Sequence, residues 1–184
     1  MHQSFVKNVD QNPIPLLLFS RSDFFLYKKL TQHYSCVMIP KFDSNGNLPP
    51  GIHSATWDEF AKRFGTTPYR MRLLKGLKKA IDSLRLAGCK SVYIDGSFVT
   101  KKEIPADFDG CWDLNGVNIT LLDPVLLDFD SGRLAQNAKY GGEIFPAQFT
   151  ENGSGKTFLE FFETDKKTGG PKGIVFLDLQ GEWE

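Results

Sequence analysis

The sequence predicts an α/β or α+β domain with a small mixed β-sheet flanked by helices. Two observations support this class: two helices with clear N-terminal caps precede residue 90, and short β-like runs recur from residue 91 onward. The 184 residues are enough for one domain with a buried core. We divide the chain into an N-terminal extension, residues 1–37, and a domain, residues 38–184, because the first segment shows no sustained apolar period.

The two capped helices lie between residues 56 and 88. Residues 56–59, Thr-Trp-Asp-Glu, form a capping box and predict a helix over 57–64 that stops at a glycine. Thr67, followed by proline, then opens a long helix that ends at Gly88. Its apolar residues recur at helical spacing: Leu73, Leu74, Leu77, Ala80, Ile81 and Leu84. Its basic residues can contact phosphates if the helix borders a cleft, but a solvated face is the commoner explanation: Arg70, Arg72, Lys75, Lys78 and Lys79.

The central stretch pairs a short strand with two aspartates. The β-like run 92–94 breaks at Gly96-Ser97, and Asp107 and Asp109 follow about ten residues later. Since residues i and i+2 of a strand point to one face, both carboxylates should project into the same space while Phe108 turns into the core.

The elements expected after this strand are short. Residues 115–118 should form a loop, and residues 121–127 a buried helix or an apolar turn interrupted by Pro124. The remaining elements are a helix over 133–140, a strand over 143–145, a helix over 157–163 that buries Phe158, Leu159, Phe161 and Phe162, a polar turn over 165–172 and a strand over 174–177.

The paired aspartates have the chemistry of a magnesium site. Two adjacent carboxylates repel unless a cation lies between them, and Mg²⁺ prefers such oxygen ligands, completed by water and phosphate oxygens. The turn at Gly96-Ser97 offers backbone N–H groups and a hydroxyl to a phosphate. The alternative is that Asp107 and Asp109 mark a solvated strand end. A rival Asp-Phe-Asp at 128–130 has no Gly-Ser turn ahead of it and favours a loop.

These residues resemble the signature of the nucleotidyltransferase superfamily, which is a strand, a Gly-Ser turn, a spacer and Asp-apolar-Asp on the next strand. Gly96, Ser97, Asp107 and Asp109 match it position by position. From Met38 onward the chain is also similar to a bacterial family of small nucleotidyltransferase-like proteins of largely uncharacterised function. That longer similarity lies in residues 39–42, 48–53, 95–100 and 139–146. Either Met38 is therefore the native start, or the preceding residues are a real appendage that packs on the domain.

The resemblance implies a nucleotidyltransferase-like fold and Mg²⁺-dependent transfer of a nucleotidyl group from a nucleoside triphosphate, such as ATP, to a protein or RNA acceptor. Asp107 and Asp109 would hold the metal, and Gly96 and Ser97 would position the phosphates. In the superfamily a third strand often carries a third carboxylate.

Glu143 is the predicted third acid, because it opens a strand-like run after two glycines that allow close backbone approach. It would complete a two-metal site or deprotonate the acceptor hydroxyl. Asp113 and Asp178 remain alternatives.

A non-catalytic class remains open beside the enzyme. The chain is short and has no evident base-recognition or acceptor domain, which favours a nucleotide-binding or regulatory module that acts through a protein partner. One component of a toxin–antitoxin pair would be such a module. The intact Gly-Ser turn and both aspartates favour catalysis instead.

Composition argues against other classes. The 22 basic residues balance the 22 acidic ones, so net charge does not draw the chain to nucleic acid or to an anionic membrane. The three cysteines lack a Cys-x-x-Cys pair and the three histidines are scattered, so we expect no zinc site and a reducing, cytoplasmic location. The apolar run 15–19 is too short to span a bilayer, so we expect no membrane partner.

Overall fold

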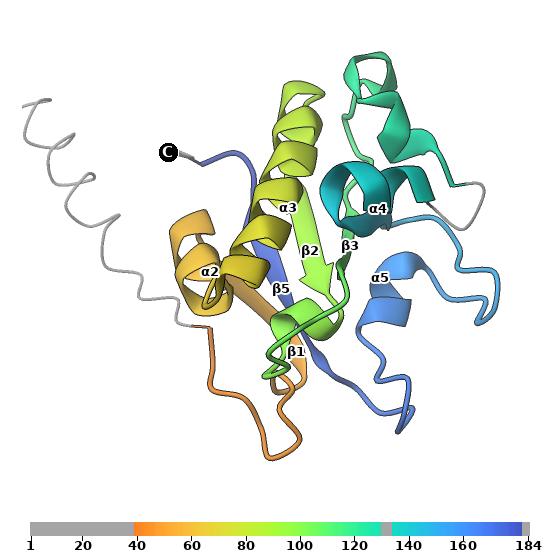
Figure 1. The fold of residues 1–184 in the computed structure, drawn as a ribbon. Helices are drawn as coiled ribbons and strands as arrows, with labels where there is room; N and C mark the ends of the chain where they lie inside the picture. Colours follow the sequence, from red (N-terminus) through yellow and green to blue (C-terminus); the bar gives the residue numbers. More distant parts are fainter. Residues whose placement is uncertain (1–38, 130–133, 182–184) are drawn as a thin grey trace, which may run out of the picture. The chain divides into compact units, whose positions relative to one another are not determined.

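The computed structural model describes residues 39–129 and 134–181, all of which belong to one compact unit. Within these ranges, five strands form one mixed sheet and four α-helices pack beside it (Figure 1). The mixed α/β class predicted from the sequence is confirmed at this level. The predicted extension, residues 1–37, lies outside the described residues.

The sheet has the strand order β1-β5-β2-β3-β4. The strands are β1 (Gly51–Ala55), β2 (Ser91–Asp95), β3 (Phe108–Trp112), β4 (Gly142–Pro146) and β5 (Gly173–Asp178). The central strand β2 runs antiparallel to both neighbours, whereas β1 pairs with β5 and β4 with β3 in parallel. Four of the strands lie where the sequence predicts them, and the edge strand β1 was not predicted.

The two capped helices form as predicted. In α2 (Trp57–Phe64), the Thr56 hydroxyl accepts from the backbone of Glu59 while the Glu59 side chain accepts from the backbone of Thr56. In α3 (Pro68–Leu86), the Thr67 hydroxyl accepts from the third helical N–H. These caps satisfy N–H groups that would otherwise have no partner in the helix.

Of the two structures predicted for residues 121–127, the turn interrupted at Pro124 is observed and the helix is not. The segment contributes to two short 3₁₀ turns, η2 (Ile119–Leu121) and η3 (Pro124–Leu127), and it is not uniformly buried. Leu121 and Leu127 are 51% and 40% exposed, because a 3₁₀ turn carries successive side chains to different sides. The helix predicted over 133–140 is α4 (Leu134–Tyr140).

The last helix also buries less than expected. Helix α5 (Phe158–Phe162) begins at a second capping box formed by Thr157 and Glu160. Of the four side chains predicted to be buried in this region, only Phe162 is fully buried. A helix of five residues presents only about one turn to the sheet, so the other three side chains remain partly exposed.

Side chains alternate between the two faces of the sheet. On one face, Ile94, Phe108 and Trp112 join α2, α3 and α4 in the main core. On the opposite face, Cys111 and Phe145 pack with α5 in a second, smaller cluster. The sheet is therefore covered on both sides, and α2 and α3 lie together over one of them (Figure 1).

A buried arginine connects the helices to the loop between β2 and β3. Arg70 of α3 is only 3% exposed, and its guanidinium donates to the backbone carbonyls of Phe64, Phe98 and Lys102. It also lies over the Phe98 ring, 4.6 Å from the ring centre. The side chain is therefore a structural clamp, which corrects the expectation that this position belongs to a solvated basic face.

We expect Arg70→Met to destabilise the fold by about 3 kcal/mol or more, because it leaves three carbonyls without their donor in a buried site. Arg72→Met is the matched control, since Arg72 is exposed on the same helix, and it should change stability by about 0.5 kcal/mol or less. Urea unfolding of both variants measures the difference. Equal losses would contradict the clamp.

Candidate functional site

Three acidic residues lie side by side at one end of the sheet, where β2 ends and β3 and β4 begin. Asp95 of β2 is paired in register with Asp109 of β3, which is paired in turn with Glu143 of β4. Residues directly opposite on neighbouring strands share a face. Their side chains therefore leave the sheet on the α5 side, with Asp107 two residues before Asp109.

The turn after β2 brings the backbone of Gly96 close to the side chain of Asp109. Gly96 has φ +79°, and a Cβ placed there would lie 2.0 Å from Oδ2 of Asp109. Only glycine accepts both this dihedral angle and this approach without a shift. The chain then enters the 3₁₀ turn η1 (Ser97–Val99), which is anchored by the buried Phe98 and Val99.

The Gly96-Ser97 turn and Asp109 line a cavity of about 290 Å³. Asp95, Asp109, Gly96 and Ser97 form one part of its wall, and the loop before β5 contributes Lys166, Lys167 and Lys172. The structure thus brings three of the predicted site residues, Gly96, Ser97 and Asp109, into one space, whereas Asp107 does not line it. We call this space the acidic cavity.

The loop before β5 is a polar turn, as predicted, and it is held by its own hydrogen bonds. The Asp165 carboxylate accepts from the backbone N–H groups of Lys167 and Thr168. At the end of the loop, Lys172 pairs with Asp95 at 2.7 Å, and both side chains are largely buried, at 16% and 4% exposed. Burial of the Asp95 carboxylate raises its pKa by more than the charge of Lys172 lowers it, so the pKa of Asp95 is raised.

Asp109 has the most perturbed carboxylate of the site. Burial, followed by the charges of Asp107 and Asp95, raises its pKa to about 6 against a weaker opposing effect of Lys166. Within the described residues, no hydrogen-bond donor reaches this carboxylate. A half-buried carboxylate in such surroundings is stabilised by a proton or by a cation.

The predicted third acid does not enter the acidic cavity. Glu143 follows the predicted register beside Asp109, but its carboxylate accepts a 2.6 Å hydrogen bond from the side chain of Asn137 on α4. Its effect on the pKa of Asp109 is weaker than the effects of Asp107, Asp95 and Lys166. The alternative third acids lie at the other end of the sheet from Asp109, since Asp113 directly follows β3 and Asp178 ends β5. The roles of Glu143 as third metal ligand or as base remain predictions.

The donor chemistry fits Mg²⁺ with few protein ligands. Asp107 and Asp109 offer only oxygen atoms, and the charge of Asp107 reaches Asp109. Among residues 39–129 and 134–181, no group of three or more His, Cys, Asp or Glu side chains is arranged to hold a metal ion. Mg²⁺ commonly uses one or two carboxylates and completes its octahedron with water and phosphate oxygens. The aspartates suit that arrangement.

Sequence reasoning missed Asp95 and the three lysines. Asp95 directly precedes the Gly-Ser turn, and antiparallel pairing of its strand with the Asp-Phe-Asp strand was a signal that could have placed it beside Asp109. The lysines carry no such signal, because Lys172 meets Asp95 across 77 positions of the chain.

The other sequence predictions fall elsewhere. In the rival Asp-Phe-Asp motif, Asp128 follows η3 outside any strand, and Asp130 lies outside the described residues.

Among the helices of the described ranges, none has both the length and the apolar character that are needed to span a membrane.

Comparison with known proteins identifies a family but supplies no activity. A model of a family of unknown function, DUF6932, matches residues 40–178. The comparisons with curated proteins and with solved structures gave no match.

Gly96→Ala should displace the Asp109 carboxylate, whereas Gly116→Ala should not. Both glycines have φ +79°, but a Cβ at Gly116 meets nothing within 4 Å. We expect both variants to lose about 1 to 3 kcal/mol of stability, because a positive φ strains any residue with a Cβ. Only Gly96→Ala should also shift the titration of Asp109, measured by carboxyl-carbon NMR. An unshifted titration would contradict the close approach.

Asp109→Asn should stabilise the metal-free protein at neutral pH but not at acidic pH. The folded pKa of about 6 lies above the ordinary 3.8, so the folded protein binds this proton more tightly than the unfolded chain. That stability is present below about pH 4 and is lost as pH rises through 6, by up to about 3 kcal/mol. Asp109→Asn has no carboxyl group to ionise at this position, so the variant does not lose this stability as pH rises. Urea unfolding from pH 4 to 8 in EDTA tests it, and a pH-independent difference would contradict it.

Proposed function

The chain belongs to the family DUF6932, and we propose that it has a nucleotidyltransferase-like fold and catalyses Mg²⁺-dependent transfer of a nucleotidyl group from a nucleoside triphosphate to a protein or RNA acceptor. The proposed setting is the cytoplasm, with action within a toxin–antitoxin system as one biological role.

One observation carries the proposal. Asp109 is a half-buried carboxylate without a donor from the described chain, and it lies beside Asp107 and against a glycine turn. Folding alone does not favour such an arrangement, since an apolar side chain at Asp109 would avoid both burial of a charge and repulsion. Carboxylates of this kind are typical of functional sites.

The residues around the cavity suit a triphosphate. Lys166 and Lys167 are exposed at its rim, where their ammonium groups can bind phosphate oxygens. Ser97 lines the same cavity, and its hydroxyl, which makes no hydrogen bond among the described residues, can donate to a phosphate. When bound by Asp107 and Asp109, Mg²⁺ would neutralise the triphosphate and stabilise charge on the leaving pyrophosphate.

The proposed reaction is a displacement at the α-phosphorus. An acceptor hydroxyl oxygen forms the new bond to phosphorus, the bond to pyrophosphate breaks, and the hydroxyl proton leaves to a base. The chain's part is to orient the triphosphate between the lysines and the Gly-Ser turn, so that the acceptor approaches from the opposite side.

A nucleotide-binding or regulatory module without catalysis is the second candidate, and the Lys172–Asp95 ion pair favours it. This pair already neutralises one carboxylate of the cavity, and the two exposed lysines can bind phosphates without metal. Such a module would act through a protein partner. It predicts triphosphate binding that EDTA leaves unchanged and no labelled product.

The test incubates the protein with each α-³²P-labelled nucleoside triphosphate and a cell lysate, with Mg²⁺ or with EDTA. We expect Mg²⁺-dependent label in protein or RNA. Asp107→Asn should abolish the labelling and weaken Mg²⁺-dependent triphosphate binding, measured by calorimetry, by about tenfold or more, because it removes a charge that the metal needs.

The matched control is Asp58→Asn, which removes an exposed carboxylate from α2 that is not among the charges acting on Asp109. It should leave labelling and binding unchanged. Folding of both variants is checked by urea unfolding. Equal Mg²⁺-dependent binding by Asp107→Asn and the unmodified chain would argue for a different site.

A further inference from the structure

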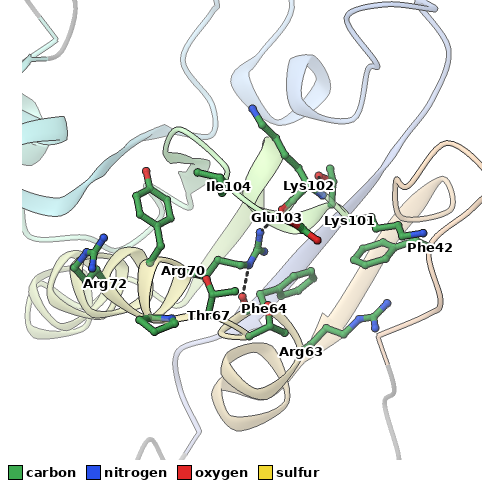
Figure 2. A pocket seen from close by; sticks show the side chains of 14 residues that line it. Phe42, Arg63, Phe64, Thr67, Arg70, Arg72, Lys101, Lys102, Glu103 and Ile104 are labelled. Carbon is green, nitrogen blue, oxygen red and sulfur yellow. Dashed lines mark hydrogen bonds between the residues drawn. The ribbon is translucent and has the colours of Figure 1, made fainter.

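A second and larger cavity lies on the other side of the β2–β3 loop. It has a volume of about 760 Å³ and is bounded by the junction of α2 and α3 and by residues 100–104 (Figure 2). Figure 2 shows Arg72 at one end of it, Arg63 and Phe42 at the other, and the Arg70 clamp between them. We call this space the basic cavity.

The charges of the basic cavity are strongly unbalanced. Its lining includes five basic side chains, Arg63, Arg70, Arg72, Lys101 and Lys102, and one acidic side chain, Glu103. None of the five forms an ion pair with a carboxylate among residues 39–129 and 134–181. In a chain with equal numbers of acidic and basic residues, this concentration is not an effect of composition. The Arg70 guanidinium is already bonded to backbone carbonyls, so the other four cations are the ones that attract an anionic ligand.

Aromatic rings stand among these cations. The Arg63 guanidinium lies 4.3 Å from the centre of the Phe42 ring, and that of Arg72 lies 5.2 Å from the centre of the Tyr69 ring. The Nε atom of Arg63 is buried and has no hydrogen-bond partner within the described residues. Both rings are partly exposed, so planar groups are available at two places in the cavity.

We propose that the basic cavity binds a segment of single-stranded nucleic acid. Cations that track a phosphate backbone, interleaved with aromatic and guanidinium planes on which bases stack, are the physical features of single-strand binding. The positive side chains lie at separate places along the cavity, which suits a row of phosphodiesters better than one compact phosphate (Figure 2). Exposed bases are required for stacking, so a duplex fits less well.

The position of the basic cavity suggests what the strand does. Thr100 lines both cavities, so only the β2–β3 loop separates them. A strand in the basic cavity is then the acceptor of the transferred nucleotidyl group, which favours RNA over protein as the acceptor. This identification rests on the proposed function, whereas the binding itself does not.

The experiment measures binding of a fluorescein-labelled RNA of about 12 nucleotides by anisotropy, in EDTA and without nucleotide. The Lys101→Ala/Lys102→Ala double variant should bind about tenfold more weakly. Its slope of log K against log salt should fall by about 1.4, since each contacted phosphate of a single strand contributes about 0.7. The Arg72→Gln variant should lower affinity in the same direction.

The matched control is Lys75→Ala/Lys79→Ala, which removes two exposed charges from α3 outside the cavity and should bind within about twofold of the unmodified chain. Equal losses in both double variants would overturn the proposal, as would equal binding of duplex RNA. Full competition by inorganic triphosphate at equal phosphate concentration would also overturn it. Labelled DNA of the same sequence separates an RNA site from one for either nucleic acid.

The two proposals fail in different ways. RNA binding without any label transfer would leave the strand site intact and refute the transferase. Label transfer to a protein acceptor with no RNA binding would support the transferase and refute the strand site.

Discussion

The burial of Arg70 is the constraint on which the arrangement of both cavities depends. A guanidinium cannot lose its charge in a protein, so its burial requires a partner for its donors. Here the partners are backbone carbonyls of Phe64, Phe98 and Lys102. Since two of these belong to the β2–β3 loop, the loop is held against the α2–α3 junction. One side of the loop then contributes Ser97 to the acidic cavity, and the other contributes Lys101 to the basic cavity.

The distribution of charged side chains around the β2–β3 loop is not explained by folding alone. Asp107 and Asp109 repel at one end of the sheet, while Lys101 and Lys102 lie in the neighbouring cavity without an ion-pair partner in the described ranges. The acidic cavity is lined by both acidic and basic side chains, whereas the basic cavity has an excess of cations, so the basic cavity is the one whose charge favours a polyanion.

Local signals in the sequence predicted the local structure well. The caps at Thr56 and Thr67 gave correct helix starts because their hydrogen bonds are made within four residues. Strand β1 was missed because its few residues show no alternation and it forms only through pairing with β5, far along the chain. The register of Glu143 followed from its strand, but its tie to Asn137 depends on where α4 packs. Long-range contacts of this kind leave no local pattern.

The shared wall of the two cavities links the chemistry of one to the ligand of the other. A nucleotidyl transfer to nucleic acid must bring two polyanions together, and their mutual repulsion has to be offset on both sides. In the proposed reaction, lysines of the loop before β5 would face one polyanion, and Lys101 and Lys102 would face the other. Thr100 borders both spaces, so the end of a bound strand needs to pass only one loop to reach the aspartates. A protein that bound only a nucleotide would have no physical need for the second set of cations.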